Sequence, residues 1–389
     1  MKKFFAILMA VLMAVSMFAA CSSAGAEAEA EVNVLKIGMT GPLTGGAAEY
    51  GKAVECGIEI AVEEINAAAE ANGGLKLAFK AEDDEADGEK AVSGYNVLKD
   101  WGMDVFIGTV TSGACNAVAP EAVADQIFLL TPSASSPDVA MAGASTFQMC
   151  FTDPNQGASA AEVIAMNWAD ATIGLVYDSS DDYSSGLYQG FMNKAEELGL
   201  NVVAETAFTA DTKADLTTQI TECKDKGCDL VFLPIYYTEA SQILNAASKM
   251  GYDPTFFGCD GMDGILSVEG FDSALAEGLA LMTPFDANAA DEATQSFVAK
   301  FKEKMNGMVP NQFAADAYDC VYAVYAAATT AGLTGEEAAA DICAALVEQF
   351  NTMTFDGLTG KGMTWDENGM ISKIPAAVVI TDGIYVPMG

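Results

Sequence analysis

The chain has 389 residues, with 55 acidic against 18 basic side chains and a formal net charge of −37 at pH 7. Such an excess of negative charge repels nucleic acid and anionic lipid headgroups, so neither is expected as a partner. Hydrophobic residues make up 51% of the chain, which is enough for a large core and excludes a disordered acidic polypeptide.

Histidine and arginine are both missing, so lysine is the sole basic residue. Without histidine, a Ser-His-Asp triad, a Cys-His pair and a histidine-bound metal are excluded. Without arginine, no guanidinium fork can hold a carboxylate or phosphate, so an anionic ligand group would meet hydroxyls, backbone N–H groups or a lysine. No cofactor, no metal and no enzymatic activity are therefore predicted; an enzyme would need Ser-Lys or carboxylate chemistry.

The N-terminus is typical of an exported bacterial protein. A positively charged start precedes an uncharged apolar run over residues 4–18, which is too short to span a membrane and fits the core of a signal peptide. The run ends in the tetrapeptide Phe-Ala-Ala-Cys at Cys21, which resembles the lipobox of bacterial lipoproteins, although Phe18 stands where leucine is usual. We predict a signal peptide over 1–20, a lipid on Cys21 and an acidic tether over 21–33. The alternative is an ordinary signal peptide followed by an incidental cysteine.

Eight further cysteines are scattered along the chain, without a CxxC pair. This spacing does not indicate a zinc site. Buried or free thiols are favoured, and a disulfide framework stays open for these residues: Cys56, Cys115, Cys150, Cys223, Cys228, Cys259, Cys320 and Cys343.

Short apolar strands alternate with helices from residue 34 onward. A strand that is a continuous apolar run and is followed by a helix indicates a parallel sheet covered on both faces. In a first block, strands are predicted at 34–39, 75–81, 105–110 and 127–131, with helices at 50–71, 88–101 and 114–124. In a second block, strands are predicted at 173–177, 202–208, 230–235 and 255–257, with helices at 156–168, 183–198, 216–226 and 239–250. The last part has helices at 291–305, 313–331 and 336–350 and strands at 363–365 and 376–380.

Hydroxyls, aromatic rings and one carboxylate directly follow these strands. Ligands of open parallel sheets bind at the carboxyl ends of strands, where helix N-termini also point. The candidates are Ser112, Ser133 and Ser135 from the first block and Tyr183, Tyr236 and Asp260 from the second. Other roles stay open. Ser112 and Ser135 could be N-caps, the tyrosines could pack at edges, and Asp260 could be a turn residue. The adjacent carboxylates of Asp83 and Asp84 are interpreted as a solvated turn.

A series of short motifs resembles the leucine/isoleucine/valine-binding family, the type I substrate-binding proteins of ABC importers. The resemblance covers nearly the whole chain from residue 34. It rests on motifs that are weak singly but occur in order: Ile37-Gly38-Met39-Thr40-Gly41-Pro42-Leu43-Thr44-Gly45, Tyr50-Gly51, Glu64-Ile65-Asn66, Asp83-Asp84, Phe106-Ile107-Gly108, Thr131-Pro132-Ser133-Ala134-Ser135, Ala317-Tyr318-Asp319 and Phe355-Asp356-Gly357-Leu358-Thr359-Gly360.

The resemblance implies two lobes of parallel sheet with helices on both faces, joined by three hinge crossings, with a ligand between the lobes. The crossings would fall near Asp153, near Pro284 and within 355–361. Lobe 1 would then comprise 34–153 and 285–355, and lobe 2 would comprise 154–284 and 356–389.

The resemblance also implies roles for individual residues. Ser112 and Ser135 match positions that hold the α-carboxylate of an amino acid, and Ser133 matches a position whose carbonyl accepts from its ammonium group. Asp260 matches the acidic position that pairs with the ammonium group. The aromatic positions around the ligand are Tyr50, Tyr183, Tyr236 and Phe313.

Three departures from the family pattern bear on ligand choice and on the hinge. Ser133 stands where alanine is common, and Asp260 is one methylene shorter than the usual glutamate. Cys150 and Phe151 occupy the place where an arginine is often found, which removes an ion pair near the hinge.

The expected function is that of an extracytoplasmic, lipid-anchored and monomeric protein that carries a neutral, for example branched-chain, amino acid to an ABC permease and ATPase complex. The lipid would hold it to the membrane of a Gram-positive type of envelope or in a periplasm. Two alternatives keep the same fold: binding of an amide, urea or aromatic acid, and a surface sensor that passes lobe closure to a membrane partner.

Overall fold

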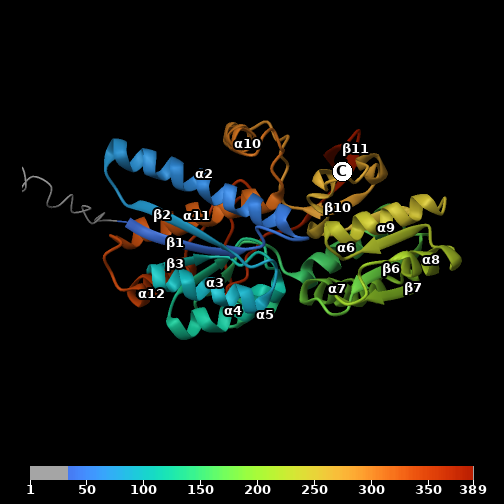
Figure 1. Cartoon of the computed structure of the whole chain (residues 1–389), viewed down its shortest axis with the longest axis horizontal. Coiled ribbons are helices and arrows are strands. Elements are labelled where there is room, and N and C mark those ends of the chain that lie inside the picture. Colours follow the sequence, from blue (N-terminus) through green and yellow to red (C-terminus); the bar gives the residue numbers. More distant parts are fainter. Residues whose placement is uncertain (1–33, 389) are drawn as a thin grey trace, which may run out of the picture.

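Two separate β-sheets organise residues 34–388, which are the residues that the computed structural model describes. Each sheet is the centre of one lobe, and the two lobes lie end to end along the long axis of the molecule (Figure 1). Cys21, the signal peptide and the tether fall outside the described residues. Among the described residues, no helix combines the length and the apolar character needed to cross a membrane.

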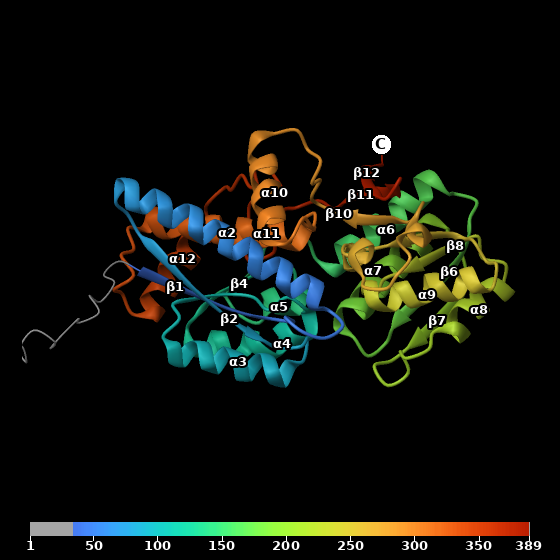
Figure 2. The same cartoon turned by 45° about the horizontal axis from the view of Figure 1, so that its top comes forward.

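The first sheet is entirely parallel, and its strand order is β2-β1-β3-β4-β5. Successive side chains of its inner strands face opposite layers: Val105 and Ile107 lie in the core cluster under α2 and α11, while Phe106 lies in the cluster under α3 and α4. Figure 2 shows the sheet between these two helical layers. The strands are β1 (Val34–Gly41), β2 (Lys76–Asp83), β3 (Val105–Ile107), β4 (Phe128–Thr131) and β5 (Thr146–Gln148). The helices are α2 (Ala48–Asn72), α3 (Gly88–Trp101), α4 (Ser112–Asp125), α5 (Pro137–Met141), α10 (Glu292–Lys304), α11 (Gln312–Ala331) and α12 (Ala339–Phe350).

The second sheet has the order β12-β11-β10-β9-β8-β6-β7 and is parallel from β10 to β7. Its last two strands, β11 and β12, pair antiparallel at one edge, as is common in large α/β sheets. The strands are β6 (Thr172–Asp178), β7 (Asn201–Phe208), β8 (Leu230–Leu233), β9 (Thr255–Gly258), β10 (Ala280–Thr283), β11 (Ala376–Thr381) and β12 (Ile384–Pro387). The helices are α6 (Asp153–Asn167), α7 (Asp182–Leu198), α8 (Thr217–Asp225) and α9 (Tyr237–Lys249), with 3-10 turns η1 (Asp260–Met262), η2 (Ile265–Ser267) and η3 (Ser273–Ala276).

The predicted fold class, two α/β lobes built on parallel sheets, is confirmed. The short elements β5, α5, β10 and β12 were not predicted. Residues 363–365 are not a strand, since they make only isolated bridges, Phe355 to Met363 and Trp365 to Ile371.

The third crossing between the lobes lies later than the predicted 355–361. Trp365 donates its indole N–H to the carbonyl oxygen of Gln148 at 2.8 Å, and its ring packs on Phe350 at 4.6 Å. The backbone N–H of Gln148 in turn donates to the carbonyl oxygen of Gly369 at 3.0 Å. These contacts tie the segment to the edge of the first sheet, so the chain joins the second sheet only at Ala376. The assignment of the residues directly after 355 to lobe 2 is therefore wrong.

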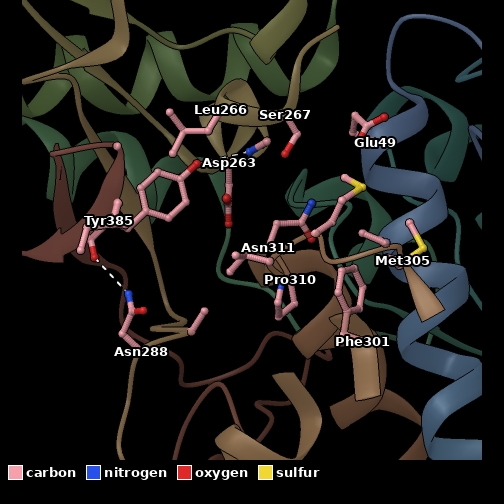
Figure 3. A pocket seen from close by; sticks show the side chains of 17 residues that line it. Glu49, Asp263, Leu266, Ser267, Asn288, Phe301, Met305, Pro310, Asn311 and Tyr385 are labelled. Atoms are coloured by element: carbon pink, nitrogen blue, oxygen red, sulfur yellow. Dashed lines mark hydrogen bonds between the residues drawn. The ribbon is translucent and has the colours of Figure 1, made fainter. Parts of the chain in front are cut away.

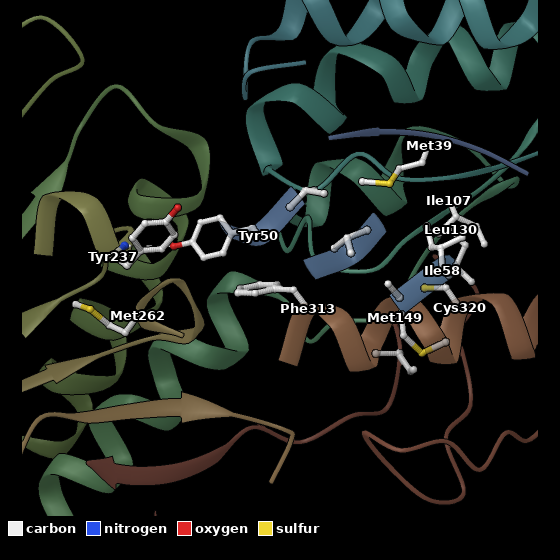
Figure 4. Packing of buried hydrophobic residues seen from close by; sticks show 14 of the residues in the cluster. Met39, Tyr50, Ile58, Ile107, Leu130, Met149, Tyr237, Met262, Phe313 and Cys320 are labelled. Carbon is white, nitrogen blue, oxygen red and sulfur yellow. Dashed lines mark hydrogen bonds between the residues drawn. The ribbon is translucent and has the colours of Figure 1, made fainter. Parts of the chain in front are cut away.

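One hydrophobic cluster continues from the first lobe into the second. Figure 4 shows Ile107 and Leu130 in the first lobe, and Phe313, Tyr50 and Tyr237 at the junction. The Tyr50 ring contacts the Phe313 and Tyr237 rings edge-on, each at 4.7 Å between centroids. Apolar packing thus reaches across the hinge instead of ending at each lobe.

All eight described cysteines are buried and free, as favoured from the sequence. Cys150 lies beside a buried ion pair in which Lys373 Nζ donates to Asp316 of α11. Both side chains of the pair are 2% exposed. Although no arginine stands at 150–151, the hinge does contain a buried cation, because Lys373 supplies one from the third crossing.

Lys373→Met is expected to lower the free energy of unfolding by about 3–5 kcal/mol, because it leaves the buried Asp316 carboxylate without its cation. The double variant Lys373→Met/Asp316→Leu should recover most of this loss, since it removes both charges. Urea unfolding followed by circular dichroism measures both, with Lys249→Met as a control at an exposed position. A double variant as unstable as the single one would contradict this account.

Candidate functional site

The carboxyl ends of the strands of both sheets meet at a small cavity between the lobes. All predicted ligand residues except Ser135 line this cavity, and Ser135 is fully buried in the same strand-end loop as Ser133. The lining residues are Tyr50, Val110, Thr111, Ser112, Ser133, Tyr183, Tyr236, Asp260, Gly261 and Phe313. The structure thus brings together residues that are up to 263 positions apart, from Tyr50 to Phe313.

The first lobe contributes hydroxyl groups and the start of helix α4. Ser112 is the first residue of α4, and its hydroxyl accepts from the backbone N–H of Ser136 at 3.2 Å. Ser133 Oγ donates to the carbonyl oxygen of Val110 at 2.8 Å. The first backbone N–H groups of a helix have no partner inside the helix, so the beginning of α4 can bind an anion.

Neither Ser112 nor Ser135 is an N-cap. In each case the N-cap is the adjacent residue. Thr111 is the N-cap of α4, and Ser136 caps α5 by accepting from the backbone N–H of Asp138. The buried hydroxyl of Ser135 has no hydrogen-bond partner among residues 34–388. It lies behind the cavity wall and beside the Asp153 carboxylate, whose pKa burial raises and this hydroxyl partly lowers, so a ligand could reach it only after a local rearrangement.

The second lobe contributes the carboxylate of Asp260, which is 3% exposed. Tyr183 donates its hydroxyl hydrogen to Asp260 Oδ1 at 2.7 Å and accepts from the backbone N–H of Gly261 at 2.8 Å. Gln156 Oε1 accepts from the backbone N–H of Asp260 at 2.7 Å, which fixes the start of η1. Neutral donors thus orient this carboxylate, and no lysine lines the cavity.

Tyr50 connects the lobes as well as lining the cavity. Its hydroxyl donates to the carbonyl oxygen of Gly261 and accepts from the backbone N–H of Tyr237 at 3.2 Å, both in the second lobe. The residue was predicted only as part of the aromatic wall. In addition, its hydroxyl connects the two lobes by hydrogen bonds.

The aromatic side chains leave little room in this arrangement. Tyr236 stacks on Tyr183 with centroids 4.8 Å apart and planes inclined by 10°. The enclosed volume is about 10 Å³, comparable with the space of one water molecule. The buried Tyr236 hydroxyl has no partner in the described part of the chain. A larger ligand can enter only if the lobes separate or if Tyr236 turns away.

Asp153 is a buried carboxylate beside the cavity. From the sequence, this residue was predicted only as the position of a crossing between the lobes. It is the first residue of α6, and it packs against Gly186 of α7, where a Cβ atom would lie 2.9 Å from the carboxylate. Neither of its side-chain oxygens has a partner among the described residues, and burial raises the pKa of Asp153 well above its usual range. The sequence contained one sign that Asp153 could belong to the site: it is a polar residue at the start of a helix, at a predicted crossing.

The Asp83–Asp84 turn is structural, and its interpretation as a solvated turn is wrong for Asp84, which is fully buried. Asp83 accepts from the backbone N–H groups of Leu43 and Thr44 at 2.8 and 3.3 Å, which fixes the loop after β1. It does not line the cavity. The described residues contain no cluster of side chains suited to a metal ion.

These features define a two-lobed binding protein in which a polar and aromatic cavity lies between hinged α/β lobes. The chain belongs to the periplasmic binding protein family, whose model matches residues 34–383, and it is similar to leucine-, isoleucine- and valine-binding proteins.

Three known proteins illustrate this membership. The leucine-, isoleucine-, valine-, threonine- and alanine-binding protein of Pseudomonas aeruginosa is 28% identical over 363 residues, which cover 93% of this chain and 94% of that protein. A branched-chain amino acid transporter substrate-binding protein from Streptococcus pneumoniae, solved with isoleucine, aligns with a TM-score of 0.78 and 26% identity, and covers 91% of this chain and 100% of that one. A solute-binding protein from R. palustris, solved with benzoate, shares the fold with a TM-score of 0.80 at 19% identity, and covers 92% of this chain and 96% of that one.

Burial raises the pKa of Asp260 to about 6, from about 3.8 in an exposed carboxyl group. The folded state binds the Asp260 proton more tightly than the unfolded state. The free energy of unfolding is therefore highest, as far as this group is concerned, below about pH 4, and it falls as the pH rises through about 6. We therefore expect Asp260→Asn to gain up to about 3 kcal/mol of unfolding free energy relative to the natural protein between pH 4 and pH 8. Urea unfolding at both pH values measures this difference.

Asp253→Asn is the matched control, because it removes the same charge at an exposed position. It should follow the natural protein at both pH values. If Asp260→Asn behaves like this control, Asp260 does not carry the cost of burial that its surroundings indicate.

Proposed function

We propose that the protein binds a neutral, for example branched-chain, amino acid between its lobes and delivers it to an ABC permease and ATPase complex outside the cytoplasm. The observation that carries this proposal is the division of the cavity into two chemical halves. Hydroxyls and the start of α4 stand on the first lobe, and a buried carboxylate without a cation stands on the second.

A zwitterion matches both halves. Its carboxylate would meet the N-terminal N–H groups of α4 and the hydroxyls of Ser112 and Ser135, which needs no arginine. Its ammonium group would meet Asp260 and the carbonyl oxygen of Ser133. Charged hydrogen bonds contribute roughly 1.5–3 kcal/mol each. Four or five of them with apolar burial would suffice for micromolar binding, about −8 kcal/mol, after the costs of ordering.

The ligand side chain would meet aromatic rings. Tyr50, Tyr236 and Phe313 line the cavity, and the pair Tyr50 and Phe313 is already in edge contact. These rings favour an apolar side chain over a charged one, because they would bury it without offering it a charged partner beyond Asp260. The relative from Pseudomonas aeruginosa is a leucine-, isoleucine-, valine-, threonine- and alanine-binding protein, and that from Streptococcus pneumoniae was solved with isoleucine.

An aromatic acid is the second candidate. The observation in its favour is that Tyr183 and Tyr236 both line the cavity with parallel rings, so that a flat ring could stack on Tyr183 if Tyr236 turned away; the R. palustris protein of the same fold was solved with benzoate. In that case Asp260 would have to be protonated or face a neutral donor.

The ligand class is tested by calorimetry at pH 7.5 with an amino-acid panel that includes leucine, its deaminated analogue 4-methylpentanoate, and benzoate. We expect leucine or another neutral amino acid to bind with micromolar affinity, and 4-methylpentanoate to bind far more weakly because it cannot pair with Asp260. Tighter binding of benzoate than of any amino acid would decide for the second candidate.

Asp260→Ala is expected to weaken amino-acid binding by at least about 30-fold, because removal of one partner of a buried charge pair costs about 2–5 kcal/mol. The fold should survive, as circular dichroism can show. Asp253→Ala at an exposed position should leave the affinity unchanged. An unchanged affinity of Asp260→Ala would remove this residue from the site.

The membrane anchor is a separate part of the proposal. If Cys21 carries a lipid, metabolic labelling of cells with a radioactive fatty acid should mark the natural protein and not the Cys21→Ala variant. An unlabelled natural protein would leave an ordinary signal peptide as the explanation, and a label that persists in Cys21→Ala would place the lipid on another residue.

A further inference from the structure

A second cavity of about 260 Å³ lies between the lobes, apart from the site described above. Figure 3 shows its walls: Glu49 of α2 and Met305 after α10 on one side, and Asp263 and Tyr385 of the second lobe on the other. The loop after β10, which forms the second crossing, closes it at Asn288. Both lobes and one hinge segment therefore build this space.

The walls are mainly apolar. Phe301, Met305 and Met308 form one side, and Leu266 lies opposite. Two rim residues are unusually exposed for aliphatic side chains, Val309 at 55% and Ile384 at 53%. Such a hollow with a few polar groups has the character of a small-molecule site.

The charged groups of the cavity are all negative. Glu49 and Asp263 line it, and no lysine does. Two of the three lysines of the adjacent helix α10 pair with α2, Lys300 with Glu64 and Lys304 with Glu59 and Glu63, and the third, Lys302, does not line the cavity. A ligand in this space would meet a carboxylate without competition from a protein cation.

Asp263 is only 3% exposed, and hydrogen bonds fix its position. Its Oδ2 accepts from the backbone N–H of Gln312, the first residue of α11, at 2.8 Å. Its own backbone N–H donates to the carbonyl oxygen of Asp260 at 2.8 Å. The single turn η1 therefore presents one carboxylate to each cavity, Asp260 to the smaller and Asp263 to the larger.

We propose that this cavity is a second ligand site, which takes a small organic cation with an apolar body and an ammonium head group directed at Asp263. The apolar body would lie between Leu266 and the side chains of Phe301 and Met305. Because the occupant touches both lobes, it stabilises the arrangement in which they are close together. The proposal concerns a different cavity from the amino-acid site and does not depend on the identity of that ligand.

Calorimetry of the full chain with three probes of one shape tests the charge preference. The probes are 3-phenylpropylamine, 3-phenylpropanol and 3-phenylpropionate at pH 8, above the pKa of about 7 to which burial raises Asp263. We expect the amine to bind at least ten-fold more tightly than the alcohol, and the carboxylate not to bind. Equal binding of amine and alcohol, or no binding of any probe, would overturn the proposal.

Two variants locate the binding. Asp263→Asn keeps the oxygen that accepts from Gln312 and should weaken amine binding at least ten-fold, whereas the exposed Asp253→Asn removes the same charge and should change nothing. Ser267→Phe fills the cavity from its exposed rim and should abolish binding, while Ser267→Ala should not. An equal loss in Asp253→Asn would reveal general attraction to the acidic surface, and unchanged binding in Ser267→Phe would place the amine elsewhere; either result refutes the site.

Discussion

The junction of the lobes depends on the burial of carboxylates in a chain that has neither arginine nor histidine. Asp316 has a cation in Lys373. Asp260 and Asp263 have neutral donors, among them the Tyr183 hydroxyl for Asp260 and the Gln312 backbone N–H and Tyr385 hydroxyl for Asp263. Burial outweighs these interactions at all three carboxylates: the pKa values of Asp260 and Asp263 are raised to about 6 and 7, and that of Asp316 is raised to about 6 in spite of its cation. A cationic group on a ligand is the partner that would make ionisation of these groups favourable.

The same constraint explains why closure of the lobes can be reversible. Among residues 34–388, the polar contacts across the cleft are hydrogen bonds without an ion pair: the Tyr50 hydroxyl bridge, the bonds from the Glu49 backbone N–H to the Tyr237 hydroxyl and from Thr238 Oγ1 to the carbonyl oxygen of Gly46, the bonds from Gln312 to Asp263 and to the carbonyl oxygen of Asp260, and the bond from Asn116 to Asp182. A typical hydrogen bond contributes only about 0.5–1.5 kcal/mol net. A ligand that adds charged hydrogen bonds to both lobes can therefore shift the balance between open and closed arrangements.

The sequence predicted the long elements and most of the cavity because both follow from local rules. A strand that is a continuous apolar run before a helix indicates a parallel sheet, and polar residues after such strands must meet at one edge; Ser112, Tyr183 and Asp260 were found in this way. The strand β5 has polar residues at both of its ends, so it lacks the continuous apolar run that revealed the equally short β3, and β10 is not directly followed by a helix. The N-cap of α4 was misplaced by one residue because Thr111 and Ser112 are both residues that favour this position, and Thr111 holds it without a side-chain hydrogen bond.

What the sequence could not reveal depends on contacts between residues far apart in the chain. The position of the third crossing is decided by the bond from Trp365 to Gln148, and the cation of the hinge by the pair of Lys373 and Asp316. In neither pair does the sequence around one residue indicate which residue it will contact. Asp153 was missed for the same reason, because its burial results from the close approach of α6 and α7 at Gly186.

The turn η1 makes the two cavities electrostatically dependent on each other. Asp260 and Asp263 are both fully enclosed, and the charge of Asp260 is one cause of the raised pKa of Asp263. A cation beside one carboxylate lowers the pKa of the other, but it also repels a second cation, so above about pH 7, where both groups are ionised, the electrostatic part of the coupling is unfavourable. Coupling of binding free energies is reciprocal, so an amine in the larger cavity and an ammonium group in the smaller one would each lower the affinity for the other through their charges, and only the lobe closure that both ligands favour acts in the opposite direction. The short connection through one 3-10 turn means that this coupling needs no large conformational change beyond the closure that both ligands favour.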